Sequence, residues 1–354
     1  MGRARTPAEA YRHFGEVDAA GTSPLYARVA VALSGSDEAL RAVEDAPARR
    51  RQPPLVLAAL HDLALAGRAP ALADAYAAGD LDAACHAAIE TLLRMSDEVA
   101  AIVGRRRVRT VDTARCAVLY PAVAEAAHRL GADAVGLIGA GSSAGLDGHL
   151  DRVGIAYDDG PVLGDPSSPV QLSPTVVGDR PVPARAVPEV VARVAVDPHP
   201  VDLADPDDAR WVRACLAPDR PDRLAELEAA LAVVASAPPL LLGGDPVDRL
   251  PDAVARVPEG ALPVVTTTWT LSTFSPERRQ RFLDRLGEAA AGRPLAWVSV
   301  EGVGVAPSIP TFGDRPASGH SILGLALFDG DSRQADAVGR CWSRGRLLSW
   351  LADG

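Results

Sequence analysis

The segment Val135–Leu146, with the sequence VGLIGAGSSAGL, is the most informative stretch of this 354-residue chain. It passes from apolar residues into a turn of small residues, Gly139–Gly145, and we expect a buried strand, a tight turn and a helix in succession. Such a turn lets backbone N–H groups and the amino end of a helix approach a polar ligand without interference from Cβ atoms. Gly139, Gly141 and Ala144 match the pattern G-x-G-x-x-[GA] of dinucleotide-binding turns.

Short apolar runs alternate with helical patterns after this segment, which is typical of a mostly parallel sheet covered by helices on both faces. The sequence therefore predicts an α/β fold, a doubly wound Rossmann-like sheet, with an antiparallel edge near Arg340–Trp342 and Arg346–Trp350. The predicted strands are Ala132–Ile138, Val190–Val196, Pro239–Gly243, Leu262–Thr268, Leu295–Glu301 and Ser321–Phe328, and the helices between them include Asp207–Leu216, Arg220–Ser236 and Pro276–Gly292.

The first 130 residues are predicted to be helical, because apolar residues recur there at i, i+3 and i+4 and glycines follow the periodic segments. We expect an all-helical N-terminal domain over 1–130 and the Rossmann-like domain over 131–354. Residues 157–188 are rich in Pro, Gly, Asp and Ser. Long irregular segments inside compact domains are often lids or binding loops, so we expect an insertion of that kind here.

The composition excludes several classes of protein. All 36 basic residues are arginine, which removes Schiff-base lysines and the phosphate-binding loop G-x-x-x-x-G-K-[ST]. The net charge of −10 is unfavourable for binding a nucleic-acid backbone. No apolar stretch approaches eighteen residues, and Met1–Arg12 lacks the apolar core of a signal peptide. We expect a cytoplasmic protein without a membrane or nucleic-acid partner.

The four cysteines are scattered, with no C-x-x-C pair, and no H-E-x-x-H motif is present. Scattered cysteines in a large acidic chain are typical of reduced core thiols. We therefore expect no disulfide framework and no protein-built metal site.

The glycine turn permits a nicotinamide interpretation. Val153–Tyr157 would then be the second strand of the sheet, and Asp158 or Asp159 would bind the ribose hydroxyls, about twenty residues after the turn. Against this, the chain continues into the proline-rich segment instead of another βαβ unit.

In a second interpretation the second strand is Val190–Val196. Gly139–Gly145, Asp197, Gly244–Asp245 and Thr266–Trp269 then follow the carboxyl ends of four neighbouring strands. Asp197 suits a ribose diol, and Asp245 suits an adenine amino group. This is the layout of a nucleoside-cofactor site in class I S-adenosylmethionine-dependent methyltransferases.

A third interpretation is a hydrolase. Gly141–Gly145 matches G-x-S-x-G, the nucleophile elbow, with Ser143 as nucleophile and Glu301 or Asp245 and then His320 in the required order. The elbow normally follows several strands, whereas no strand is predicted before Ala132.

Stretches spread over nearly the whole chain are similar to a known family. They are Gly21–Tyr26, Arg51–Pro54 leading into Ala58–His61, Thr110–Arg115, Gly141–Leu146 followed by Asp151-Arg152, Gly164–Val170, and Asp197–Leu203. On these stretches the chain resembles the mostly actinobacterial domain of unknown function 2332 family, which is uncharacterised and whose core looks like a class I methyltransferase. The resemblance implies membership and names no reaction.

The chain also departs from this family. Gly139 stands where members carry an acidic residue, which in methyltransferases helps to anchor the amino-acid end of the cofactor. Val265–Thr268 replaces a Tyr-His-Ser motif, and Thr110–Arg115 is shortened and lacks an Asn-Glu pair. These departures imply altered chemistry, a different ligand or lost activity.

Three groups of candidate residues follow from these interpretations. The residues expected to hold S-adenosylmethionine are Gly139, Gly141, Ser142, Ser143, Gly145, Asp197, Gly244, Asp245 and Thr266. The catalytic candidates are Thr267, which can orient a nucleophile, Glu301, the carboxylate best placed for proton abstraction, and His199. The substrate-binding candidates are His61, on the helix predicted at Pro53–Ala66, together with Asp165 and Trp269.

The sequence thus predicts a small-molecule methyltransferase that uses S-adenosylmethionine and acts by proximity and orientation. One alternative is a methyltransferase-like protein that has lost methyl transfer and binds a ligand or catalyses another reaction. A second alternative is an NAD(P)-dependent oxidoreductase.

Overall fold

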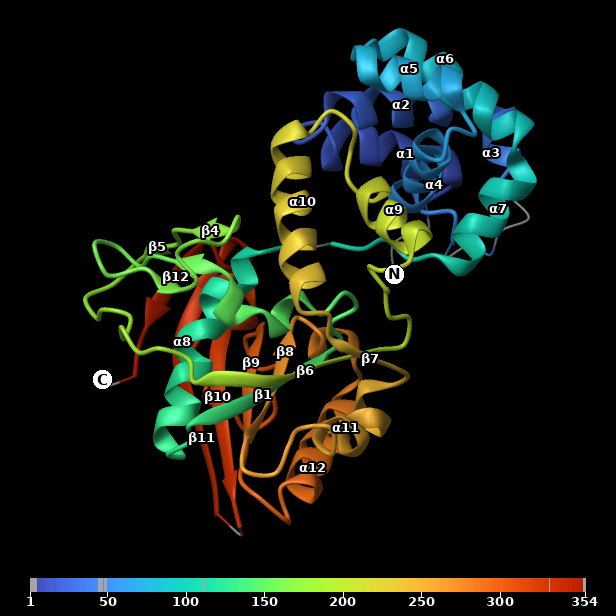
Figure 1. Ribbon diagram of the computed structural model, residues 1–354. Helices are drawn as coiled ribbons and strands as arrows, with labels where there is room; N and C mark the ends of the chain where they lie inside the picture. Colours follow the sequence, from blue (N-terminus) through green and yellow to red (C-terminus); the bar gives the residue numbers. More distant parts are fainter. Residues whose placement is uncertain (1–4, 44–46, 48–49, 111, 331, 353–354) are drawn as a thin grey trace. The chain divides into compact units, whose positions relative to one another are not determined.

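The computed structural model describes residues 5–43, 47, 50–110, 112–330 and 332–352 (Figure 1). The chain divides into two compact units. The helical unit comprises Met1–Thr110 and Ala204–Glu228, and the sheet unit comprises Val111–Leu203 and Ala229–Gly354. Within the described residues no single helix is long and apolar enough to cross a membrane; the helices Pro53–Leu65 and Pro70–Ala78 pass that test only as a pair bent by 101°.

The helical unit is built around α4 (Pro53–Leu65), in which every residue from Leu55 to Ala64 is buried. Several helices begin at a side-chain cap; Ser23, for example, accepts a hydrogen bond from the backbone N–H of Tyr26. The helices around α4 are α1 (Pro7–His13), the π-turn η1 (Phe14–Asp18), α2 (Pro24–Ser34), α3 (Asp37–Arg41), α5 (Pro70–Ala78), α6 (Leu81–Arg94) and α7 (Ser96–Arg105).

A segment from the middle of the chain completes this unit. The helix α9 (Pro206–Ala214) buries Trp211 and Ala214 in the helical core. The indole N–H of Trp211 donates to the carbonyl of Arg107 at 2.7 Å, and Arg210 pairs with Asp62 at 2.9 Å. The next helix, α10 (Pro221–Ser236), begins in the helical unit and ends in the sheet unit.

The sheet unit contains nine strands in one mixed sheet within the described residues. Their order is β5-β12-β11-β10-β9-β8-β1-β6-β7. Neighbours from β7 to β9 are parallel, whereas β10, β11 and β12 pair antiparallel. The strands are β1 (Ala134–Ala140), β5 (Thr175–Val176), β6 (Glu189–Asp197), β7 (Leu240–Gly243), β8 (Leu262–Thr268), β9 (Leu295–Gly302), β10 (Ser321–Asp329), β11 (Ser332–Trp342) and β12 (Leu347–Trp350).

Helices cover both faces of the sheet because side chains alternate along its strands. On β9, Val298 and Val300 belong to the core shared with α8 (Ala114–Arg129), whereas Trp297 belongs to the core on the other face. That second core is closed by α11 (Pro246–Val254) and α12 (Pro276–Ala289), which lie together beside the sheet in Figure 1. The prediction of a mixed α/β chain with a helical N-terminal region and a large sheet is confirmed.

The units do not follow the boundary that the sequence suggested at residue 130. The helix α8 lies in the sheet unit because twelve consecutive residues, Cys116–Ala127, are buried against the sheet and its surroundings. In turn, the segment 204–228 belongs to the helical unit.

The helix expected directly after the glycine turn is replaced by two short 3₁₀ turns, η3 (Leu146–Gly148) and η4 (Leu150–Arg152). The left-handed Gly145, with φ of +72°, precedes η3, and the buried His149 ties the turns together through a contact from Nδ1 to the carbonyl of Gly145 at 2.9 Å. The prediction of a regular helix directly after the glycine turn is therefore wrong.

The segment predicted as an insertion forms little regular structure. It contributes to a separate three-stranded sheet of β2 (Gly154–Ile155), β3 (Leu163–Gly164) and β4 (Gln171–Leu172), and β5 pairs with β12 at the edge of the large sheet.

Candidate functional site

The glycine turn is tied to the strands on both sides of β1. The backbone N–H of Gly141 donates to the carbonyl of Val196 on β6 at 2.7 Å. On the other side, the hydroxyl of Thr270 donates to the carbonyl of Ala140 at 3.0 Å. The turn therefore sits at the carboxyl edge of the sheet, where the direction of successive connections reverses between β1 and β8.

Protein neighbours account for the glycines of the turn. A Cβ atom on Gly141, whose φ is +82°, would lie 2.5 Å from the side chain of Thr270. A Cβ on Gly139 would lie 2.7 Å from Cβ of Ser142, and one on Gly145 would lie 2.5 Å from Pro239. These close approaches explain the small residues without a ligand, so the glycine pattern does not by itself identify a cofactor site.

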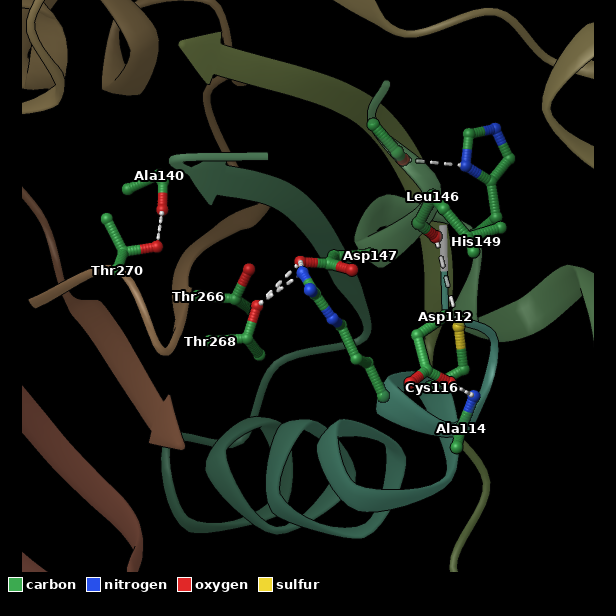
Figure 2. A network of polar contacts seen from close by, with 12 residues as sticks. Asp112, Ala114, Cys116, Ala140, Leu146, Asp147, His149, Thr266, Thr268 and Thr270 are labelled. Carbon is green, nitrogen blue, oxygen red and sulfur yellow. Dashed lines mark hydrogen bonds and ion pairs between the residues drawn. The ribbon is translucent and has the colours of Figure 1, made fainter. Parts of the chain in front are cut away.

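A polar network lies at the same edge, and Figure 2 shows Asp147 and Thr268 facing one another within it. The hydroxyl of Thr268 donates to Oδ2 of Asp147 at 2.9 Å. Arg115, in the first turn of α8, approaches both groups more loosely, with Nη1 at 3.4 Å from the Thr268 hydroxyl and 3.9 Å from Asp147 Oδ2. Asp147 is buried, and only about a fifth of the Arg115 side chain is exposed, at 21%.

The guanidinium of Arg115 is poorly satisfied. Its Nε is buried and has no hydrogen-bond partner among the described residues. Its Cζ lies 5.3 Å from the ring centroid of Trp269, which adds a cation–π contact. A buried polar atom without a partner is costly, so this Arg115 is suited to receive an anionic group from outside the chain.

Arg115 and Asp147 were not identified as site residues from the sequence. Both lie in or directly beside the stretches that carry the family resemblance, at Thr110–Arg115 and Gly141–Leu146. Their proximity depends on α8 packing against the sheet, and the sequence had assigned α8 to the other domain.

The three threonines that end β8 are bonded to the protein. The Thr266 hydroxyl donates to the carbonyl of Ile138 at 3.5 Å, and the Thr267 hydroxyl accepts from the indole N–H of Trp297 at 3.1 Å. Trp269 follows with a φ of +55°, and its indole N–H donates to the hydroxyl of Ser321 at 2.8 Å. Of these residues, Thr268 and Trp269 contact the polar network directly.

Glu301 is fully buried at the end of β9. Its Oε1 accepts backbone N–H groups from Thr270 at 3.0 Å and Leu271 at 2.9 Å, while Oε2 has no partner among the described residues. Burial raises the pKa of this carboxyl to about 7, against the opposing effect of the backbone donors. In this structure Glu301 holds the segment that follows Trp269.

The acidic residues after β6 and β7 take part in local structure. Asp197 is buried, and its Oδ1 accepts the backbone N–H of the exposed His199 at 2.8 Å. Asp245 caps α11 by accepting the N–H of Val247 at 2.9 Å, and it pairs with Arg278 at 2.7 Å. Gly244 precedes this cap with a φ of +139°.

Of the remaining predicted residues, Ser143 lies in the glycine turn, whereas Asp165 and His61 lie elsewhere in the fold. The backbone carbonyl of Ser143 accepts the N–H of Val201 at 2.8 Å. Asp165 is half-buried and accepts the N–H and the hydroxyl of Ser167 at 2.8 and 2.6 Å, which makes a local turn. His61 belongs to the helical unit, where its Nδ1 faces the carbonyls of Ala214 and Leu216.

Two interpretations of the glycine turn lose their structural basis. The strands that pair with β1 are β6 and β8, whereas Asp158 lies in a turn after β2, so the strand placement needed for a nicotinamide site is absent from the described residues. The hydrolase interpretation needs His320 to act with Glu301 or Asp245. In the structure His320 pairs with Asp314 at 2.9 Å, Glu301 accepts backbone N–H groups and Asp245 pairs with Arg278.

Comparison with known proteins identifies one family. No curated protein and no solved structure matches the chain. The model of a family described as an uncharacterized protein conserved in bacteria (DUF2332) matches residues 8–350. Because this match spans nearly the whole chain, from α1 to β12, the protein belongs to this bacterial family.

Proposed function

We propose that the chain binds S-adenosylmethionine at the carboxyl edge of its sheet and transfers the methyl group to a small molecule. The observation that carries this proposal is the order of the parallel strands, β7-β6-β1-β8-β9, which in chain order is third, second, first, fourth and fifth. This order matches that of doubly wound Rossmann-like sheets, in which ligands bind where the strand order reverses, and it supports the proposal. The polar network of Arg115, Asp147 and Thr268 lies at that reversal, between β1 and β8.

The chemistry of this network fits the amino-acid end of the cofactor. The under-satisfied guanidinium of Arg115 would bind the carboxylate, because planar guanidinium and carboxylate groups pair through two parallel hydrogen bonds. Asp147 would bind the ammonium group. It would thus take the role of the acidic residue that the resemblance implies at the position of Gly139. Asp197, at the end of the neighbouring β6, would contact the ribose hydroxyls.

When bound, S-adenosylmethionine supplies a methyl group activated for nucleophilic attack. The residues of the chain contribute orientation: Arg115 and Asp147 fix one end of the ligand, and Trp269 presents an aromatic ring beside Arg115. The Thr266 and Thr267 hydroxyls are bonded within the sheet, and Glu301 is bonded to the backbone. We therefore propose catalysis by proximity, on a substrate that needs no proton removal by the protein.

Isothermal titration calorimetry with S-adenosylmethionine, S-adenosylhomocysteine, NAD and NADP tests the proposal. We expect micromolar binding of the two adenosyl ligands, weakened at least tenfold in Arg115→Gln and in Asp147→Asn. The matched controls are Arg285→Gln and Asp284→Asn on the exposed side of α12, which should bind as the wild type does. Failure of both adenosyl ligands to bind would contradict the proposal, and binding of NAD or NADP instead would favour an oxidoreductase.

A second candidate is a protein with this fold that binds the adenosyl ligand without methyl transfer. The threonine hydroxyls of β8 are bonded within the protein and Oε1 of Glu301 is bonded to the backbone, which favours it. Incubation with S-adenosylmethionine labelled in the methyl group and a small-molecule extract separates the two. Label in an extracted compound supports the enzyme, and tight binding without transfer supports the second candidate.

A further inference from the structure

The helical unit contains a cavity of about 370 Å³, formed by α4, α5 and the inserted segment at residues 213–228. Its wall is mainly apolar, with Ala64, Leu65, Ala73, Leu216 and Leu224 among the lining residues. All the lining residues belong to the helical unit. Because a cavity of about 150 Å³ holds one benzene ring, this one has room for about two rings.

His61 is one of the few polar residues that line this cavity. Its Nδ1 lies 3.0 Å from the carbonyl of Leu216 and 3.3 Å from that of Ala214, so Nδ1 carries the proton. Its Nε2 has no hydrogen-bond partner among the described residues, and the ring packs edge-to-face on Tyr76 at 5.7 Å. Burial lowers the pKa of His61 to about 4, so the imidazole is neutral at pH 7 and Nε2 presents a lone pair.

The cavity carries no net charge at neutral pH. Its two ionised lining residues, Arg213 and Glu228, pair with each other through two contacts, Nε to Oε1 at 2.5 Å and Nη2 to Oε2 at 2.8 Å. Leu65 and Leu224 are 46% and 41% exposed, so the apolar surface continues to the solvent. An uncharged, mostly apolar occupant is therefore favoured over an anion or a cation.

The size and the lining of the cavity favour a small molecule. A cavity of a few hundred Å³ with an apolar wall and few polar groups is typical of small-ligand sites.

We propose that this cavity binds a small uncharged molecule of one or two rings whose O–H or N–H group donates to Nε2 of His61. The site is formed by the helical unit alone and does not depend on the proposed methyl transfer.

Calorimetric titration with indole, 1-methylindole and indole-2-carboxylate tests each part of the proposal. Indole has the size, the neutral charge and the N–H donor. We expect it to bind at least tenfold more tightly than 1-methylindole, which lacks the donor, and than the carboxylate, which is charged. Equal binding of indole and 1-methylindole, or no binding of indole, would overturn the proposal.

Two variants locate the site. Ala73→Leu fills the cavity and should weaken indole binding at least tenfold, while Ala78→Leu, on the exposed side of the same helix, should leave it unchanged. His61→Phe keeps a ring and should abolish the preference for indole over 1-methylindole. S-adenosylmethionine binding to Ala73→Leu should equal that of the wild type, so failure of this site is distinguishable from failure of the proposed methyltransferase. Unchanged indole binding in Ala73→Leu would contradict the assignment.

Discussion

Glu301 shows how a single side chain can differ from its predicted role. The sequence identified it as the carboxylate best placed for proton abstraction, because it ends a strand at the carboxyl edge. In the structure the residues after Trp269 fold over it and direct two backbone N–H groups at one of its oxygens. Sequence position predicted the strand end, but the burial of Glu301 results from a segment whose path could not be read from local pattern.

This burial makes stability depend on pH. The pKa of Glu301 is raised from 4.5 to about 7 on folding, so the folded state holds its proton more tightly than the unfolded state. The resulting stabilisation is fully present below about pH 4.5 and is lost as pH rises through about 7. In the wild type, this group should lower the free energy of unfolding by up to about 3 kcal/mol as the pH rises from 5 to 8. In Glu301→Gln we expect that decrease to be absent.

Urea denaturation at the two pH values measures the effect. Glu189→Gln, at an exposed position on β6, is the control and should retain the wild-type pH dependence. A Glu301→Gln variant with the same pH dependence as the wild type would show that Glu301 is ionised throughout.

At the scale of elements, the pattern of apolar residues was sufficient to predict where the longer strands lie. Each of the six predicted apolar runs overlaps a strand of the large sheet, and the antiparallel pair expected near the end of the chain is present as β11 and β12. The helix after the glycine turn was predicted wrongly because the left-handed Gly145 and the contact from His149 to its carbonyl favour short 3₁₀ turns. Glycine patterns alone do not distinguish a ligand cradle from close contact within the protein.

The contact of the glycine turn with Thr270 can be tested directly. Gly141→Ala combines a left-handed conformation with a Cβ atom 2.5 Å from Thr270. Gly260→Ala has a similar φ of +88° and open space around the new atom. We expect Gly260→Ala to cost about 1 kcal/mol and Gly141→Ala at least about 1 kcal/mol more, because of overpacking. Equal losses in chemical denaturation would show that the turn can move away from Thr270.

At the scale of the whole molecule, the sequence predicted a helical region and a sheet region but not how the chain is shared between them. Trp211 lies about 80 residues beyond the predicted helical domain, 1–130, yet it is buried in the helical core. Periodicity reports that a helix has an apolar face and does not report which core receives that face. For the same reason, the contact of Arg115 with Asp147 could not be predicted from the sequence.

This sharing predicts how fragments behave. Residues 1–130 alone lack α9 and expose the buried face of α8, so we expect aggregation and no cooperative thermal transition. Residues 1–110 joined to 204–228 by a flexible glycine-serine linker retain the helical core and should melt cooperatively by circular dichroism. Cooperative unfolding of fragment 1–130 would contradict this division of the chain.

The inserted segment also bears on how the protein is made. A ribosome adds about 5–20 residues per second, so roughly ten seconds separate the synthesis of the first 110 residues from that of α9. During that interval the pocket of the helical core that receives Trp211 is open, and it becomes available to chaperones that bind apolar surface on nascent chains. The speed of translation through residues 111–203 thus sets how long the helical core remains without α9.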